Sequence, residues 1–167
     1  MSIMDPLITE LQHEAAGARK VLERIPEEHY GWKPHAKSMS MGRLASHVAE
    51  SFQWLKMILE RDEFVMDPAG YKPFEAPSRA ALLERFDSGL KEALAAMRGR
   101  SDAEMTKIWR LKVGGRTVIE TPRAGVVRTM VLNHLIHHRG QLTVYLRLKD
   151  VAVPALYGPT ADEPAPY

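Results

Sequence analysis

The 167-residue sequence contains no cysteine. This absence excludes disulfide bonds, thiolate ligands to a metal ion and a cysteine nucleophile. A chain without disulfides fits a reducing compartment, so we expect a cytoplasmic protein. The sequence also lacks any apolar run close to the roughly 18–20 residues that span a bilayer. Its first residues have neither the charged start nor the apolar core of a signal peptide. The sequence therefore predicts no association with a membrane.

Neither sign of charge is in large excess: 23 lysines and arginines are balanced by 21 aspartates and glutamates, and the formal net charge is +2. The basic residues are dispersed, and the longest basic cluster, Arg98-Gly99-Arg100, is too short to form a nucleic-acid-binding face. The sequence therefore predicts no nucleic-acid partner. Its length is that of one domain, so we expect residues 1–167 to fold as a single domain.

Hydrophobic periodicity predicts four long helices. They cover approximately residues 5–24, 40–61, 78–97 and 121–148. Suitable N-caps stand at their starts: Asp5, Ser40, Ser78 and Thr121. Between Lys107 and Glu120 the pattern alternates around Gly114-Gly115, which predicts a short hairpin. The expected fold is all-α, a four-helix bundle with a small β-hairpin insertion before the last helix.

The last predicted helix is apolar on nearly every side. Helical spacing places one set of residues on its inner face: Val127, Met130, Val131, His134, His138, Leu142 and Tyr145. A second set, Leu132, Ile136 and Thr143, lies roughly opposite. No helix in a four-helix bundle is central, so this second strip predicts a contact with another molecule. We therefore expect a homodimer.

Three of the seven histidines lie in this helix, at His134, His137 and His138. His134 and His138 are four residues apart, the spacing at which two imidazoles on one helix can bind one metal ion. The same spacing occurs in H-E-x-x-H metalloproteases, but Leu135 replaces their glutamate. His47 lies on the inner stripe of the second predicted helix.

A single histidine on an apolar face is more often a hydrogen-bonded core residue than a ligand. Burying several imidazoles without partners would cost about 1–3 kcal/mol each, whereas one metal ion satisfies them together. Neutral histidine suits zinc, nickel, copper and iron(II). His137 is the main alternative to His138 as the second ligand on the last helix. We expect His137 to point away from the site, since it projects about 100° from its neighbour.

Two further residues are candidates for supporting roles. Glu50, one turn after His47, is placed to act as a general acid or base, but a solvated helix carboxylate is the favoured interpretation. Gln141, three residues beyond His138, is either an amide that orients a ligand or a helix-surface amide. The segment from Val153 to Pro166 is rich in proline, and we expect it to pack back against the bundle near the end that holds the metal site.

The sequence resembles the DinB family, within the DinB/YfiT-like superfamily of metalloenzymes. The resemblance covers almost the full length and includes Trp32-Lys33-Pro34-His35, Leu44-Ala45-Ser46-His47, Asn133-His134, His138-Arg139-Gly140-Gln141 and Tyr157-Gly158-Pro159. It implies a four-helix bundle that binds a divalent metal ion, usually nickel or zinc, through three histidines. Mapped onto this chain, those ligands are His47, His134 and His138.

Three functions are compatible with this resemblance. Relatives in the superfamily include transferases and isomerases that use low-molecular-weight thiols, so a thiol-dependent S-transferase acting on a small molecule is the first hypothesis. A metal-dependent hydrolase is the second. A non-catalytic metal-binding stress-response protein is the third. The family name derives from damage-inducible genes and does not imply contact with DNA.

Overall fold

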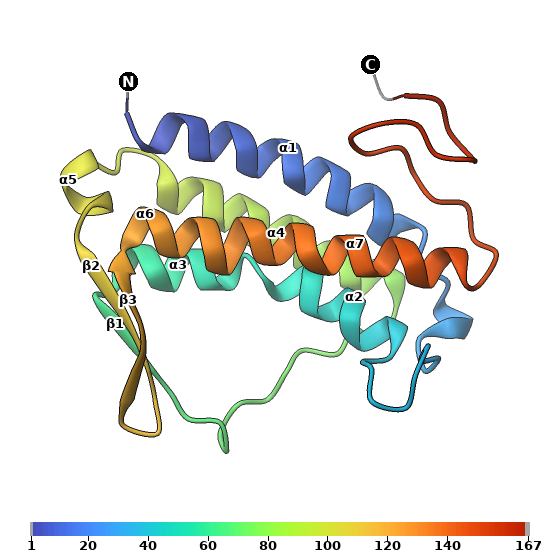
Figure 1. Ribbon diagram of the computed structural model, residues 1–167, viewed down its shortest axis with the longest axis horizontal. Helices are drawn as coiled ribbons and strands as arrows, with labels where there is room; N and C mark the ends of the chain where they lie inside the picture. The colour runs from blue at the N-terminus through green and yellow to red at the C-terminus, as the bar shows by residue number, and fades with distance from the viewer. Residues whose placement is uncertain (1, 166–167) are drawn as a thin grey trace.

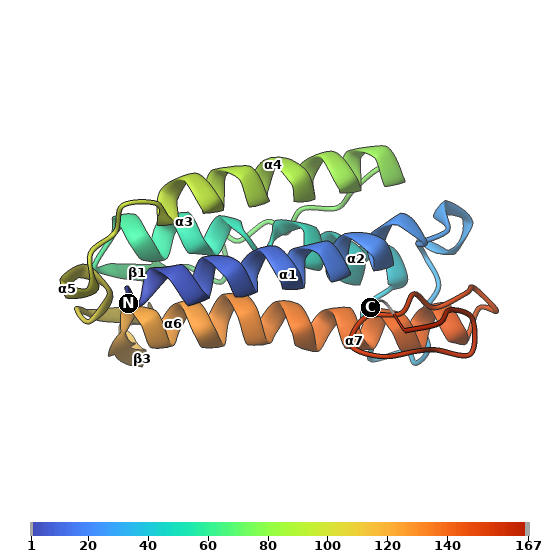
Figure 2. The same cartoon turned by 90° about the horizontal axis from the view of Figure 1, so that it is seen from above.

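Four helical columns pack side by side in the computed structural model, which describes residues 2–165 (Figure 1). The long helices that build them are α1 (Met4–Glu23), α2 (Met41–Glu50), α3 (Gln53–Glu60), α4 (Arg79–Met97) and α7 (His134–Arg147). Seen from above, α1 lies between α4 and α7 (Figure 2). Helix α2 contacts both α4 and α7 on the other side. The predicted helical bundle is therefore confirmed.

The helix predicted over residues 40–61 is in fact two helices, α2 and α3. Ser40 caps α2 as predicted, because its Oγ accepts a hydrogen bond from the Arg43 backbone N–H at 3.2 Å. At Ser51 the side-chain hydroxyl donates to the carbonyl of Val48 at 2.7 Å. Such back-bonding weakens and bends helices. Phe52 then enters the core, with its ring centroid 5.0 Å from that of Phe86.

Two of the predicted N-caps, Asp5 and Thr121, do not cap their helices. Helix α1 begins at Met4, and the preceding Ile3 N–H donates to the Asp102 carboxylate at 2.7 Å, so Asp5 is not its cap. Asp102 opens the short helix α5 (Asp102–Met105). Thr121 does not cap the last helix either, since it belongs to a strand. At the other end of α1, a short 3-10 helix, η1 (Glu27–His29), follows.

The fourth column is α6 (Arg123–Val126), then a π-helical segment, η2 (Val127–Asn133), and then α7. A π-helix takes more residues per turn than an α-helix, so side chains rotate away from the faces expected at 3.6 residues per turn. Leu132 is consequently fully buried inside its own bundle, and its placement on an outer strip is wrong. Ile136 and Thr143 are half-buried. The homodimer stays a prediction.

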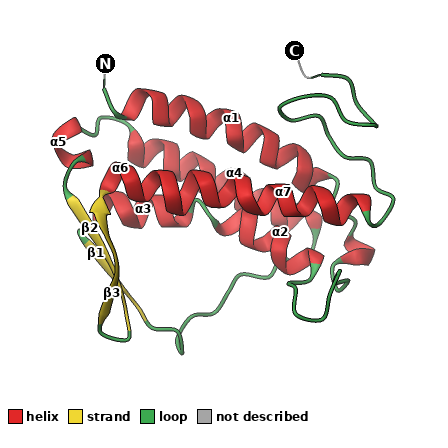
Figure 3. Cartoon of the chain, viewed as in Figure 1, coloured by secondary structure: helices red, strands yellow, loops and turns green. Residues whose placement is uncertain are grey.

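A small sheet of three strands lies at one end of the bundle (Figure 3). Strands β2 (Ile108–Val113) and β3 (Arg116–Pro122) form the predicted antiparallel hairpin. Its turn holds Gly114 and Gly115 at φ values of 55° and 77°, where glycine is favoured. The sequence did not predict β1 (Glu63–Met66), which pairs in parallel with β2 and completes the order β1-β2-β3.

The C-terminal residues 151–165 pack back against the bundle, as predicted for this part of the chain. The Tyr157 hydroxyl donates to the Glu14 carboxylate at 2.6 Å, and the same carboxylate forms a buried ion pair with Arg139 at 2.7 Å. Arg139 therefore faces α1, and the segment covers the α1 side of α7 rather than the side nearest the three histidines. Pro166 lies outside the described residues.

None of the helices among the described residues is long and apolar enough to cross a membrane.

Candidate metal centre

His47, His134 and His138 meet in the space between α2 and α7. The Nε2 atom of His134 lies 3.3 Å from Nε2 of His47 and 2.8 Å from Nε2 of His138. Each residue offers one ring nitrogen, and the three atoms lie within 4.8 Å of one another. The spacing of four residues puts two of these rings one turn apart on the same side of α7. The cluster could therefore hold a divalent metal ion.

In His47 and His138, a hydrogen bond to Nδ1 determines that Nε2 is the nitrogen with a lone pair. His47 Nδ1 lies 3.1 Å from the Glu50 carboxylate, and His138 Nδ1 lies 2.7 Å from the Gln141 side-chain oxygen. Both oxygens accept hydrogen bonds, so each Nδ1 carries the proton and each Nε2 presents a lone pair. Two lone pairs thus converge on His134 Nε2, an arrangement that a single cation would satisfy.

Burial keeps His134 and His138 uncharged. Burial, together with the neighbouring His138 and His47, lowers the pKa of His134 to about 4. Burial also lowers the pKa of His138, although the Gln141 hydrogen bond opposes this effect. Both rings are therefore neutral at pH 7, which is the form that binds a metal ion. Imidazole nitrogen is a suitable ligand for zinc or nickel.

Glu50 is the central support of the His47 ring. Its side chain is 8% exposed, so the interpretation as a solvated helix carboxylate is wrong. It accepts hydrogen bonds at 3.1–3.2 Å from His47 Nδ1, Arg43 Nη2, the Tyr71 hydroxyl and the Phe74 N–H. Burial raises the pKa of Glu50, but the hydrogen bonds from these neighbours outweigh burial and leave the pKa below its usual value. Glu50 therefore remains ionised and orients the imidazole.

Arg43 adds a positive charge that the sequence analysis did not single out. One of its nitrogens bonds to Glu50, whereas Nη1 is buried without a hydrogen-bond partner among the described residues. Its charge contributes to the lowered pKa of His138, which places it beside the cluster. A buried donor left unpaired costs about 1–3 kcal/mol. Its position one turn before His47 was the only signal available in the sequence.

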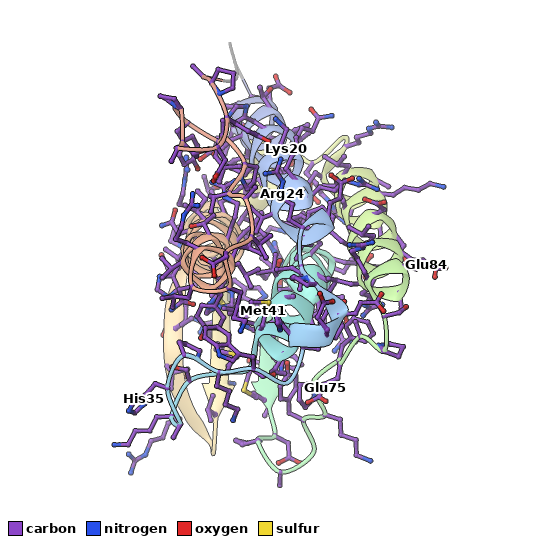
Figure 4. All side chains as sticks on the ribbon, turned by 90° about the vertical axis from the view of Figure 1, so that its right-hand side faces the viewer. Lys20, Arg24, His35, Met41, Glu75 and Glu84 are labelled. Atoms are coloured by element: carbon purple, nitrogen blue, oxygen red, sulfur yellow. The ribbon has the colours of Figure 1, made fainter. Side chains whose placement is uncertain are left out.

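Among the described residues, 2–165, the other histidines lie outside this cluster. His137 is exposed, and its ring centroid is 4.8 Å from that of His138, but its nitrogens do not join the convergent group. His13 and His35 are exposed. Figure 4 shows His35 at the outer edge of the molecule, on the loop that precedes α2. The structure thus groups the three residues selected from the sequence and leaves the others outside.

Two cavities open beside the cluster. The smaller, of about 230 Å³, is lined by His47, Trp54, Met66, Thr129, Met130 and His134. The larger, of about 500 Å³, lies on the Glu50 side and shares Trp54 and Met66 with the first. A convergent set of metal-binding side chains beside a concave, largely apolar space is the usual form of a small-molecule site.

These features are those of a DinB-like helical bundle with a cluster of three histidines that could hold a metal ion. The family model described as DinB family matches residues 1–166, so the chain belongs to the DinB family. It is 25% identical over 132 residues to the uncharacterized protein YjoA of Bacillus subtilis, covering 77% of this chain and 79% of that protein. It is 22% identical over 164 residues to the uncharacterized YrdA of the same organism, covering 98% and 93% respectively.

Solved structures show the same fold. The crystal structure of YjoA from Bacillus subtilis, described as a DinB-like protein, superposes with a TM-score of 0.69 at 18% identity and covers 90% of this chain and 96% of that one. A DinB-like protein from Bacillus cereus gives a TM-score of 0.66 at 19% identity, covering 87% of this chain and 92% of that one. At these identities the likeness establishes the fold alone.

Proposed function

We propose that the protein is a metal-dependent enzyme in which His47, His134 and His138 hold one divalent ion, nickel or zinc. We further propose that it transfers a low-molecular-weight thiol to a small electrophilic substrate. The observation that carries the proposal is the convergence of three imidazoles within 4.8 Å, two of them oriented by a second hydrogen bond. The absence of cysteine means that the reacting sulfur belongs to a cosubstrate.

Three protein ligands leave at least one coordination position for a substrate. Among the described residues, no fourth histidine or carboxylate joins the convergent group. A bound divalent ion lowers the pKa of a coordinated thiol, so that the thiolate is available near neutral pH. This open position next to two cavities supports an enzyme over a non-catalytic protein whose metal is enclosed by four side chains.

The surrounding residues have distinct roles in this proposal. Glu50 and Gln141 hold the His47 and His138 rings in the tautomer that presents Nε2. Arg43 Nη2 donates to the Glu50 carboxylate at 3.1 Å, so its positive charge helps to keep Glu50 ionised. In the reaction the thiol proton passes to solvent, sulfur forms a bond to carbon, and the leaving group departs with its electron pair.

A metal-dependent hydrolase is less well supported. It needs a proton acceptor close to the ion, and Glu50 is the acidic residue beside His47. That carboxylate already accepts four hydrogen bonds, and its pKa lies below the usual value. A carboxylate stabilised in this way is a weak base. The structure therefore favours a reaction in which Glu50 orients His47 rather than one in which it takes a proton.

The proposal is tested with protein loaded separately with zinc and nickel. Glutathione, bacillithiol and mycothiol are each offered with a panel of small electrophiles, and the thioether product is detected by mass. We expect product with loaded wild type and at least a 100-fold lower rate with His134→Ala, which removes the central ligand. No product with any pair, despite full metal loading, would refute the transferase and leave the metal site standing.

A further inference from the structure

The smaller cavity beside the histidines has a lining that is unusual for its position. Next to the imidazoles of His47 and His134 stand the indole of Trp54 and the thioethers of Met66 and Met130. The sixth lining residue, Thr129, uses its hydroxyl to donate to the carbonyl of Gly125, at the end of α6, at 2.9 Å. A space that touches two metal-binding rings is thus otherwise lined largely by apolar side chains.

We propose that this cavity, the apolar slot, binds an apolar group of the substrate, about the size of a benzene ring, next to the reacting centre. The inference rests on the proposed function, because the slot is useful only if chemistry occurs at the three histidines. The slot further defines the chemical class of the substrate. The reacting molecule carries a compact hydrocarbon group close to its thiol or electrophilic carbon.

Three irregular features of the fold build the slot. The break between α2 and α3 follows His47 and leads directly to Trp54. Strand β1, which the sequence did not predict, ends at Met66. The π-helical segment supplies Thr129 and Met130 immediately before His134. Single π-helical turns within α-helices occur frequently at functional sites. Each departure from a regular four-helix bundle thus contributes a wall to the same cavity.

The Trp54 ring is held in place for contact. Its centroid lies 5.7 Å from that of Phe64, and the two rings are nearly perpendicular at 86°. This edge-to-face arrangement is a favoured aromatic geometry. Methionine side chains are flexible and polarisable, so Met66 and Met130 can adjust to rings or branched chains of slightly different shape. One rigid wall and two adaptable walls suit a family of small apolar groups.

The volume of the slot limits the size of the group that it can hold. Apolar cavities of about 150 Å³ accommodate benzene, so a slot of about 230 Å³ holds a ring with a short connecting chain. It is too small for a nucleotide or a peptide. The rest of a longer molecule has room in the adjoining 500 Å³ cavity, which shares Trp54 and Met66 and reaches Tyr71 and Lys72. The apolar group and the remainder of the molecule would therefore lie on either side of the Trp54 and Met66 side chains.

The test uses cobalt(II)-loaded full-length protein and a series of simple thiols: ethanethiol, propanethiol, butanethiol and benzyl mercaptan. Binding is read from the thiolate-to-cobalt absorption band, so it does not depend on activity. Burial of one methylene contributes about fourfold in affinity. We expect Kd to fall by about this factor per methylene and to be at least about 30-fold lower for benzyl mercaptan than for ethanethiol.

Met130→Gln places an amide in the slot with little change in length and should remove most of this dependence. Met39→Gln is the matched control, because Met39 is exposed and does not line the slot. An affinity independent of the hydrocarbon group, or an unchanged dependence in Met130→Gln, would overturn the slot while leaving thiol binding at the metal intact.

Failure of the metal site itself would be recognised separately, because no thiolate-to-cobalt band would form with any thiol. Binding to the slot is then measured in the metal-free protein by NMR of labelled methionine methyl groups, with benzyl alcohol as the probe. Shifts of the Met66 and Met130 signals, with the Met39 signal unchanged, would retain the slot. Absence of those shifts would reject it.

Discussion

Glu50 connects the candidate metal ligands to a part of the chain far away in sequence. Its carboxylate receives hydrogen bonds from His47 on the same helix and from Tyr71 and Phe74 in the connection between β1 and α4. The connection thereby covers Glu50, which is why this carboxylate is buried. Glu50 thus orients the His47 ring and holds Tyr71, which lines the larger cavity.

Glu50→Gln should therefore weaken metal binding without unfolding the protein. The amide keeps the volume but loses the charge that stabilises the proton on His47 Nδ1, and changes of this kind cost about 10–100-fold in affinity. Competition with a chelator of known affinity measures the change. Glu60→Gln, at an exposed position of the neighbouring helix, is the control. Equal affinities of the two variants would show that Glu50 does not support the site.

The two adjacent histidines of α7 offer a second comparison at the residue scale. His138 Nε2 lies 2.8 Å from His134 Nε2, whereas His137 is exposed and outside the cluster. His138→Ala should lose at least 100-fold in metal affinity, and His137→Ala should retain the wild-type value. Isothermal titration with zinc distinguishes them. Equal loss in both variants would mean that the ligand set is wrong.

The sequence was informative about these ligands because helical geometry is local. The spacing of His134 and His138 determines that their rings lie one turn apart, and His47 falls on the same stripe as Leu44 and Val48. Burial of Glu50 could not be inferred in this way. It depends on Tyr71 and Phe74, whose positions follow from the path of a connection with no regular structure.

At the scale of elements, regular periodicity was predictable and its interruptions were not. Helical spacing places Leu11 and Leu22 on one face of α1, and both are buried, as is Phe86 of α4. The break at Ser51 and the π-helical segment change the local number of residues per turn, which a uniform 3.6-residue pattern cannot register. Strand β1 is short and pairs with a strand distant in sequence, so no local signal marks it.

Helix α5 carries a capping box that gives a prediction at this scale. Ser101 Oγ accepts from the Glu104 N–H, and the Glu104 carboxylate accepts from the Ser101 N–H at 2.8 Å. The hydrogen bonds that this carboxylate accepts from the Ser101 N–H, the Ser101 hydroxyl and Arg100 lower the pKa of Glu104 to about 2 from its ordinary value of 4.5. The stabilisation is therefore present above about pH 4.5 and is lost as the pH falls toward 2.

Glu104→Gln should reduce the free energy of unfolding at about pH 6, and the difference from wild type should shrink at about pH 3. Urea denaturation at the two pH values measures both quantities. Glu84→Gln is the control, since this exposed residue lies on the outer face of α4 (Figure 4). A Glu104→Gln effect that does not change with pH would contradict the assigned role of the carboxylate.

At the scale of the whole molecule, the C-terminal segment closes the bundle on the side opposite α2. The Tyr157 hydroxyl reaches the buried pair of Glu14 and Arg139, and Gly17 leaves the space that Arg139 needs. A Cβ atom at Gly17 would lie 2.8 Å from Arg139 Nη1. The segment therefore connects α1 to α7 after the last helix has ended.

The homodimer expected from the sequence stays a prediction, which light scattering of the purified protein would test.

Tyr157→Phe should lower the free energy of unfolding by about 1–3 kcal/mol, because it leaves part of a buried charged group without its hydrogen bond. Metal affinity should not change, since the histidines lie on the α2 side of α7. Thermal denaturation and zinc titration of the same samples check both expectations. Truncation after Val153 should produce a larger loss of stability with the same metal affinity. If both variants melt like wild type, the C-terminal segment contributes nothing to the fold.

The central claim is that one divalent ion is bound by three histidines. X-ray absorption of protein loaded with one equivalent of zinc tests it most directly, because imidazole ligands give a distinctive scattering pattern. The account predicts three imidazole nitrogens at about 2.0–2.1 Å, with one further ligand from solvent or buffer, and loss of this pattern in His134→Ala. A spectrum with fewer than two imidazoles, or one that His134→Ala leaves unchanged, would contradict it.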